Sequence, residues 1–159
     1  MSDLIVRPAE QKDVKRICEL LKIYSEQHIV LARDEADITY YLKNFTVCEI
    51  DGTVEGCSAL RDFGNDLYEV RSLVVSPDKK GMGIGRKMIE FQFRKFAGSN
   101  ADIRIFALTY QVGFFKKMGF SVVEKELFPE KIWSDCAKCA KREKCDEIAV
   151  LYEIKPENL

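Results

Sequence analysis

The sequence lacks several features that would place it at once in a broad functional class. It has no excess of one charge, since 25 Lys and Arg residues stand against 26 Asp and Glu residues, a net charge of −1. We therefore expect no general electrostatic attraction to nucleic acid or to an anionic membrane surface. No stretch approaches the ~20 apolar residues of a membrane-spanning helix. The N-terminus also lacks the basic and then apolar layout of a signal peptide, so a cytoplasmic protein is expected.

Low-complexity segments and internal repeats are missing as well. The 159 residues are 47% hydrophobic, and no linker-like stretch interrupts them. A chain of this length and composition is typical of one compact domain with a single core. We therefore expect residues 1–159 to form a single domain.

Histidine is nearly absent, which limits what the six cysteines can do. Three cysteines fall on apolar faces of expected elements and are predicted to be buried thiols: Cys18, Cys48 and Cys57. The other three lie in the segment 125–147, ahead of the last expected strand: Cys136, Cys139 and Cys145. A structural zinc site needs four ligands, and neither a second Cys-x2-Cys nor a nearby histidine completes the set. Reduced thiols or one disulfide are favoured there over a metal site, and a redox-active pair is the weakest alternative.

What the sequence does have is a glycine-rich turn after an apolar run that begins at Leu73. Gly81, Gly83 and Gly85 let the backbone approach a bulky anion. Their amide groups would lie at the positive end of the helix that follows. The segment therefore predicts a phosphate-binding turn.

A helix after this turn is predicted by apolar residues at three- and four-residue steps, and Gly98 would end it. These apolar residues are Ile84, Met88, Ile89, Phe93 and Phe96. Two other phosphate-binding motifs do not fit, because a P-loop needs Gly-Lys-Ser/Thr and a dinucleotide fold needs an acidic residue ~20 positions on. The residues 85–87, Gly-Arg-Lys, match neither.

The remaining elements are predicted from alternation, helical periodicity and turn residues. Strands are expected over 4–9, 47–50, 54–60, 67–75 and 103–108, and helices over 14–24 and 112–118. Asp51-Gly52 is typical of a tight hairpin turn. Thr109 is expected to be the N-cap of the helix over 112–118, and Gly119 is expected to end that helix.

In this order the segments resemble the GNAT superfamily of acetyl-CoA-dependent N-acetyltransferases. The residues 80–85, Lys-Gly-Met-Gly-Ile-Gly, resemble its Arg/Gln-x-x-Gly-x-Gly/Ala signature, and 114–120 resemble its second cofactor motif, Tyr-x-x-x-Gly-Phe. The resemblance implies an α/β (α+β) fold with a mixed, mostly antiparallel central sheet that is flanked by helices and splayed at the cofactor-binding strand. It also implies acetyl-CoA as the cofactor.

The resemblance further implies how acetyl-CoA is bound. Backbone groups of the strand would hold the pantetheine arm and the thioester carbonyl, and the turn would hold the pyrophosphate. Phe115 stands where the family commonly has the tyrosine that protonates the leaving thiolate, so Tyr110 or water is left for that role. The implied cofactor-binding set is Leu73, Val74, Val75, Lys80, Gly81, Met82, Gly83, Ile84, Gly85, Arg86 and Phe115.

Glu69 is the candidate general base. By the resemblance it lies where many family members place a carboxylate that draws the proton from the amine through water, and the alternative is a solvated strand glutamate. Arg71 projects from the same face by the period of two and could hold a carboxylate with two hydrogen bonds.

A more specific resemblance is to short stand-alone amino-acid acetyltransferases of the N-acetylglutamate synthase type. It rests on Phe115 and on the segments 69–73, 108–111 and 129–136. It implies a small-molecule acceptor, L-glutamate first, and thus a reaction of arginine biosynthesis; a homodimer is compatible with it. The implied acceptor-binding set is Arg71, Ser72, Lys131 and Trp133. The alternatives for the last two are a surface lysine and a core tryptophan.

Two other functions stay open at this point. The acceptor could be a protein N-terminus, a lysine or a polyamine, which an acidic acceptor groove would favour. The chain could also be a non-catalytic acetyl-CoA sensor in which the cysteine segment is the output element.

Overall fold

The computed structural model describes residues 3–128 and 147–155. Within these ranges seven strands form a mostly antiparallel sheet in the order β1-β2-β3-β4-β5-β7-β6. The chain divides into two compact units, Met1–Arg61 with Val70–Ala97, and Asp62–Glu69 with Gly98–Leu159. The strand β4 (Leu67–Val75) passes from the second unit into the first. A single domain over residues 1–159 stays a prediction.

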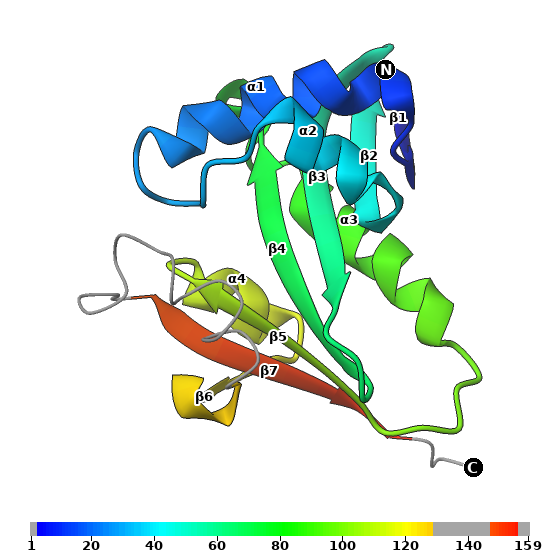
Figure 1. Cartoon of the computed structure of the whole chain (residues 1–159), viewed down its shortest axis with the longest axis vertical. Coiled ribbons are helices and arrows are strands. Elements are labelled where there is room, and N and C mark those ends of the chain that lie inside the picture. The colour runs from blue at the N-terminus through cyan, green and yellow to red at the C-terminus, as the bar shows by residue number, and fades with distance from the viewer. Residues whose placement is uncertain (1–2, 129–146, 156–159) are drawn as a thin grey trace. The chain divides into compact units, whose positions relative to one another are not determined.

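The first unit holds three further strands and the three longer helices that precede residue 97 (Figure 1). They are β1 (Leu4–Pro8), α1 (Val14–Ser25), α2 (Glu35–Tyr40), β2 (Phe45–Ile50), β3 (Thr53–Asp62) and α3 (Ile84–Phe93). The strands β1 and β2 pair antiparallel, as do β2 and β3. The hairpin between β2 and β3 turns at Asp51 and Gly52, whose φ angles are 51° and 87°. Such a pair of positive φ angles is what Asp-Gly favours in a tight hairpin.

Alternating residues of the strands bury two different cores in this unit. Val47 and Val74 pack with the apolar face of α1, in a cluster that includes Ile17 and Leu21. Cys48, the neighbour of Val47, instead packs with α3. Since successive strand side chains point to opposite faces, α1 and α3 cover opposite faces of these strands.

The helix α3 approaches β3 closely. A Cβ atom on Gly56 would lie 3.0 Å from Ile84 Cγ2 and 3.1 Å from Met88 Cε, so only glycine fits without a shift. A buried pair adds polar contacts, because the Ser58 hydroxyl donates to Gln92 Oε1 at 3.0 Å and Gln92 Nε2 donates to the Ser58 carbonyl at 2.9 Å. The position of α3 on β3 is therefore fixed by both packing and hydrogen bonds.

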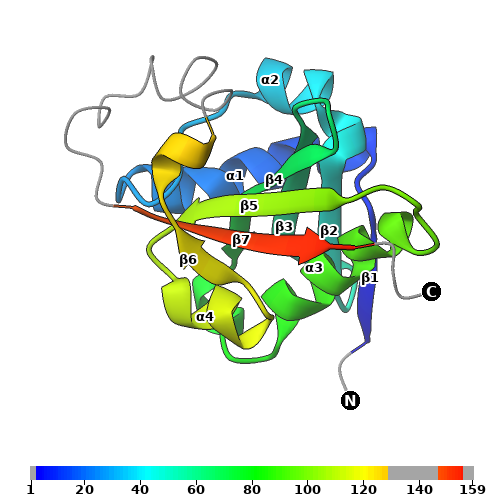
Figure 2. The ribbon, with the colours of Figure 1, turned by 90° about the horizontal axis from the view of Figure 1, so that it is seen from below.

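The second unit contains β5 (Ile103–Thr109), α4 (Val112–Lys117), β6 (Ser121–Val123) and β7 (Ile148–Ile154). Figure 2 shows β5 and β7 side by side, and the strand β7 pairs antiparallel with both β5 and β6. Its core contains Leu67, Ala149 and the stacked rings of Phe106 and Phe128, whose centroids are 4.0 Å apart. The first three residues of β4 pair parallel with β5, and this ladder ends at Glu69.

Most elements expected from the sequence are confirmed, including the strand that precedes the glycine-rich turn and the helix that follows it. Gly98 and Gly119 have φ angles of 78° and 100°, as expected for residues that end helices. The expected N-cap is wrong: Thr109 is the last residue of β5, and α4 has Gln111 as its N-cap. The Thr109 hydroxyl instead accepts a hydrogen bond from the Gln111 amide at 2.7 Å. The short helix α2 was not predicted. Among the described residues no helix is long and apolar enough to cross a membrane.

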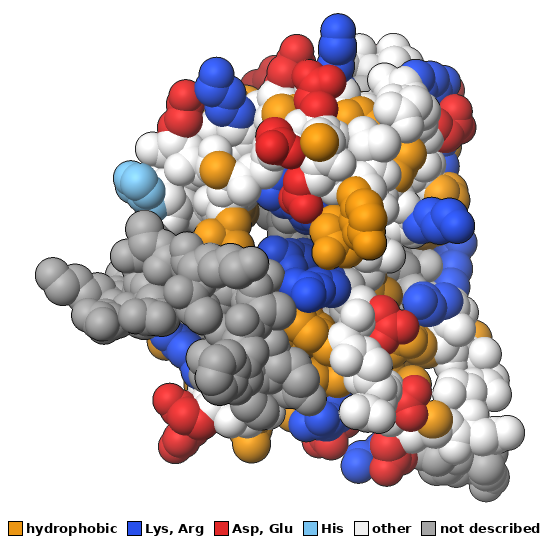
Figure 3. All heavy atoms as spheres, in the orientation of Figure 1, with side chains coloured by type: hydrophobic (Ala, Val, Ile, Leu, Met, Phe, Trp, Pro, Cys, Tyr) orange, Lys and Arg blue, Asp and Glu red, His pale blue; other side chains and the backbone are white. Residues whose placement is uncertain are grey.

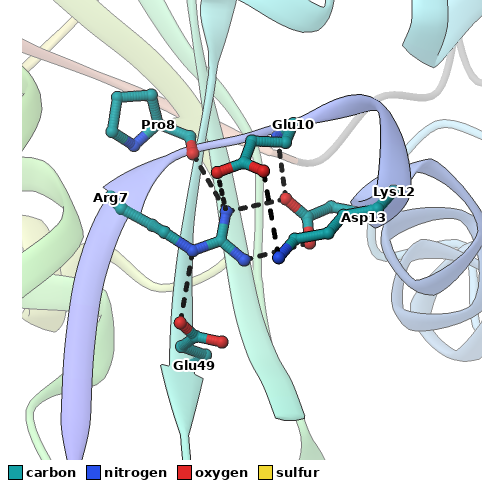
Figure 4. Close-up of polar contacts among 6 residues, drawn as sticks. All are labelled: Arg7, Pro8, Glu10, Lys12, Asp13 and Glu49. Carbon is teal, nitrogen blue, oxygen red and sulfur yellow. Dashed lines mark hydrogen bonds and ion pairs between the residues drawn. The ribbon is translucent and has the colours of Figure 1, made fainter. Parts of the chain in front are cut away.

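A buried ion pair ties β1, β2 and the start of α1 together (Figure 4). Arg7 holds both carboxylate oxygens of Asp13, at 2.8 and 3.1 Å, and its Nε donates to Glu49 at 3.3 Å. Asp13 also accepts a hydrogen bond from the Glu10 amide at 2.8 Å. The side chains of Arg7 and Asp13 are largely shielded from water.

These contacts set the titration of both groups. The hydrogen bond to Asp13 raises the pKa of Arg7 above its usual range. Burial by itself would raise the pKa of Asp13, but the hydrogen bonds from Arg7 and from the Glu10 amide outweigh it and leave that pKa below its ordinary value of 3.8. A carboxyl whose pKa is lower in the folded state stabilises the fold above its unfolded pKa, and this contribution disappears as the pH falls through the folded pKa.

We expect the substitution Asp13→Asn to lower the free energy of unfolding at pH 7 by about 1.5 to 3 kcal/mol, because it removes the carboxylate that accepts two charge-assisted hydrogen bonds from Arg7 and leaves Glu49 as the remaining hydrogen-bonded carboxylate. The difference between wild type and variant should shrink as the pH falls below ~4, where the wild-type carboxyl becomes protonated. Urea unfolding at several pH values measures both effects. Glu90→Gln is the control, since the exposed Arg86–Glu90 pair should contribute at most ~0.5 kcal/mol. A pH-independent difference for Asp13→Asn would contradict the ion-pair explanation.

Candidate functional site

The predicted phosphate-binding turn connects β4 to α3. Gly81 and Gly83 have φ angles of 85° and 77°, and nothing lies within 4 Å of a Cβ atom built on either one. Gly83 is the N-cap of α3, whose first turn carries no acidic side chain. The amides at the start of a helix have no partner within the helix and carry a partial positive charge. The open turn therefore fits a bulky anion such as a pyrophosphate.

The side chains around this turn differ in what they can contribute. Ile84 is buried in the cluster beneath α3, so only its backbone can face an anion. Arg86 is exposed and pairs with Glu90, at 3.1 Å between Nε and Oε2. Lys80 is exposed, and its ammonium lies 5.0 Å from the centre of the Tyr24 ring. Met82 is also exposed.

The strand β4 is irregular just before the segment expected to bind the pantetheine arm. Ser72 adopts a φ of 55°, the left-handed region that residues other than glycine rarely enter. Beyond it, Val74 packs on the α1 side of the sheet, while Leu73 and Val75 pack on the α3 side. The strained residue therefore lies directly ahead of the predicted cofactor-binding residues.

Two side chains hold Ser72 in this conformation, and sequence reasoning did not identify the first. Arg33, whose side chain is 6% exposed, donates from Nη1 to the Ser72 hydroxyl at 3.1 Å. Its Nε is paired with Asp37 at 2.5 Å, and its guanidinium lies 5.0 Å from the centre of the Phe45 ring. The thiol of Cys57 contacts the Ser72 carbonyl at 3.5 Å. Burial raises the pKa of Cys57 to about 12, so this group stays a thiol.

The candidate base Glu69 is buried, with 2% of its surface exposed. The alternative of a solvated strand glutamate is therefore wrong. Glu69 is also the last residue of β4 that pairs with β5, opposite Phe106. Arg71 follows two residues later, is half-buried and directly precedes Ser72.

The other predicted site residues fall into two groups. Phe115 is buried in α4 with its ring edge-to-face against Phe114 and Phe120, and Tyr110 is half-buried between β5 and α4. Five further residues with predicted roles lie outside the described ranges: Lys131 and Trp133, and, with their metal or thiol alternatives, Cys136, Cys139 and Cys145.

The three earlier cysteines are free thiols, with Cys48 and Cys57 buried and Cys18 half-buried. Over the described ranges, no group of three or more His, Cys, Asp or Glu residues could hold a metal ion.

The surface over α1 and α2 carries both signs of charge. Figure 3 shows acidic and basic side chains interspersed there, with apolar side chains among them. Such a mixed surface provides no continuous basic stripe of the kind that follows a phosphate backbone.

Comparison with known proteins agrees with this geometry. Residues 41–122 match the family described as the acetyltransferase (GNAT) domain. A Chlorobaculum tepidum protein, named as an uncharacterized N-acetyltransferase, is 37% identical over 94% of this chain and 96% of its own length. The amino-acid acetyltransferase of Mycobacterium tuberculosis is 32% identical over 76% of this chain and 70% of its own.

A solved structure is similar over almost the whole chain. It is the N-acetylglutamate synthase of Neisseria gonorrhoeae complexed with coenzyme A and N-acetyl-glutamate, and the two superpose with a TM-score of 0.82 at 26% identity. The match covers 95% of this chain but 35% of that one. The chain thus spans about a third of the length of that synthase.

We expect the strain at Ser72 to be measurable. Ser72→Ala removes the hydroxyl that accepts from Arg33 and keeps a side chain at positive φ, whereas Ser72→Gly removes the same hydroxyl and also relieves the strain. Both variants should be less stable than wild type, and the glycine variant should be the more stable of the two by ~1 kcal/mol. Urea unfolding of the three proteins tests this, and an alanine variant at least as stable as the glycine variant would contradict it.

Proposed function

The chain belongs to the GNAT acetyltransferase family, and from that premise we propose that it acetylates the amino group of an amino acid, with L-glutamate as the first candidate. Membership makes it an N-acetyltransferase that uses acetyl-CoA. The observation that carries the choice of acceptor is the similarity, over 95% of this chain, to a synthase solved with N-acetyl-glutamate. The position of Arg71 in β4 supports the same choice.

The residues of the turn and of β4 fit acetyl-CoA. The amides over residues 81–86 and the charges of Lys80 and Arg86 would hold the pyrophosphate, because the turn is open and basic. The backbone of Leu73, Val74 and Val75 would bind the pantetheine arm, and one of its amides would donate to the thioester oxygen. Bound acetyl-CoA would supply an activated carbonyl, to whose carbon the acceptor amine would bond as the C–S bond breaks and coenzyme A leaves as a thiolate.

Glu69 would remove the proton that the acceptor ammonium must lose before it can attack. Its carboxylate is buried at the end of the β4–β5 ladder, which suits a proton transfer through one water molecule. Phe115 has no proton to give to the leaving thiolate, so Tyr110 or water would supply it.

We expect Glu69→Gln to lower kcat by ~100-fold, because general-base catalysis typically contributes at least that factor. The Kd of coenzyme A should stay unchanged, because Glu69 is not part of the proposed cofactor-binding set. Steady-state rates at saturating substrate and calorimetric titration with coenzyme A measure these effects. A variant that keeps its rate would show that the carboxylate is not the base.

Arg71 supports an acceptor that carries a carboxylate. It precedes Ser72 in β4, whereas the charge of Arg33, which also contacts Ser72, is paired with Asp37. Arg71 can bind a carboxylate with two parallel hydrogen bonds. Ser72, Lys131 and Trp133 complete the proposed acceptor-binding set.

We expect L-glutamate to be acetylated when the twenty amino acids are screened with acetyl-CoA and a thiol-detecting reagent. Arg71→Ala should raise the acceptor KM by ~30-fold or more, the equivalent of the ~2 kcal/mol lower limit for leaving a buried charge unpaired. The KM for acetyl-CoA should change little. Arg94→Ala, which removes an exposed arginine outside the site, is the matched control.

The same screen separates the other functions. Inert amino acids together with an acetylated polyamine, lysine peptide or peptide N-terminus would contradict the amino-acid acceptor and leave the acetyltransferase assignment intact. Binding of coenzyme A without turnover of any acceptor would indicate a sensor.

A further inference from the structure

One aromatic side chain in α1 contacts both parts of the proposed acetyl-CoA site. Tyr24 is 6% exposed, and its hydroxyl donates to the carbonyl of Val75, the last residue of β4, at 2.6 Å. The face of the same ring lies 5.0 Å from the ammonium of Lys80, which begins the glycine-rich turn. The hydroxyl therefore contacts the strand and the ring contacts the turn.

The contact with the ring bears on how Lys80 can bind an anion. A lysine carries a compact charge on a flexible stem, and fixing that stem costs conformational entropy. The negative face of an aromatic ring attracts an ammonium. The side chain of Tyr24 is itself fixed, because it is buried in the core between α1 and the strands. Its ring is therefore placed to hold the Lys80 ammonium before any ligand binds.

The hydrogen bond from Tyr24 to Val75 acts at the start of the segment that leads from β4 to Lys80. The residues 76–80 connect the Val75 carbonyl to Lys80, and within them the Ser76 amide donates to the Glu55 carbonyl at 2.7 Å. A short hydrogen bond from a buried hydroxyl to Val75 fixes the point at which the chain leaves β4. Both ends of the segment 75–80 are thus tied to one side chain.

We propose that Tyr24 is a positioning residue for the acetyl-CoA site, because its ring orients Lys80 toward the pyrophosphate and its hydroxyl fixes the end of β4. Tyr24 itself touches no ligand in this scheme. The proposal rests on the proposed function, in which the turn over residues 80–86 binds the pyrophosphate.

A double-mutant cycle on coenzyme A binding tests the role of the ring. Lys80→Met should weaken binding by ~10-fold in the wild-type background, but only by about 2-fold in the Tyr24→Leu background, where the ammonium is no longer oriented. Tyr24→Phe keeps the ring and should keep the full effect of Lys80→Met. Calorimetric titration with coenzyme A gives each Kd without recourse to turnover. Effects of Lys80→Met that are equal in the wild-type and Tyr24→Leu backgrounds would overturn the proposal, since a purely structural Tyr24 would change all affinities alike.

Two controls make the outcome specific. Tyr40→Leu alters a tyrosine that is 80% exposed in α2 and should leave every Kd unchanged. Gly83→Val places a side chain in the open turn at positive φ and should weaken coenzyme A binding at least 10-fold. If Gly83→Val has no effect, the proposed binding turn is wrong; if it weakens binding while the Tyr24–Lys80 cycle shows no coupling, only the positioning role fails. Tyr24→Met provides a second variant without a ring should Tyr24→Leu not fold, because methionine adapts to irregular core space.

Discussion

The backbone of β4 beyond Glu69 is the feature on which the rest of the proposed chemistry depends. Its irregular residue, Ser72, has a conformation that its own side chain disfavours. Three side chains from earlier parts of the chain hold the strand in place: Arg33 at the Ser72 hydroxyl, Cys57 at the Ser72 carbonyl and Tyr24 at the Val75 carbonyl. The strained conformation therefore persists because polar contacts with distant residues support it.

The glycine-rich turn is anchored by the helix that follows it. Glycines with positive φ would make the turn mobile if it stood alone, but α3 directly after it is packed closely against β3 at Gly56, where a side chain would require a shift. The reciprocal hydrogen bonds of Ser58 and Gln92 further restrict sliding of the helix along the strand. A turn that is open to a ligand but anchored at both ends is preorganised, which lowers the entropy lost on binding.

The sequence sufficed where the physical cause is local. Alternation, helical periodicity and turn glycines lie within a few residues of one another, and they correctly predicted the hairpin, α1, β4 and α3. Arg33 was missed because its partner Ser72 lies 39 residues away, and no spacing within either segment signals the contact. The six residues of α2 are too few for a periodic pattern. The N-cap at Thr109 was wrong because a threonine hydroxyl can satisfy a nearby amide in a turn as readily as at a helix start.

Two carboxylates, those of Asp13 and Glu69, are both shielded from water, but their burial has different explanations. The charge of Asp13 is compensated by Arg7, which donates to both of its carboxylate oxygens. Because this pair joins β1 to the start of α1, the fold explains why Asp13 is buried. Burial of a carboxylate is consequently no proof of function. Glu69 is buried at the end of the β4–β5 ladder, two residues before Arg71. The proposed proton transfer therefore rests on this position in the strand, and not on burial alone.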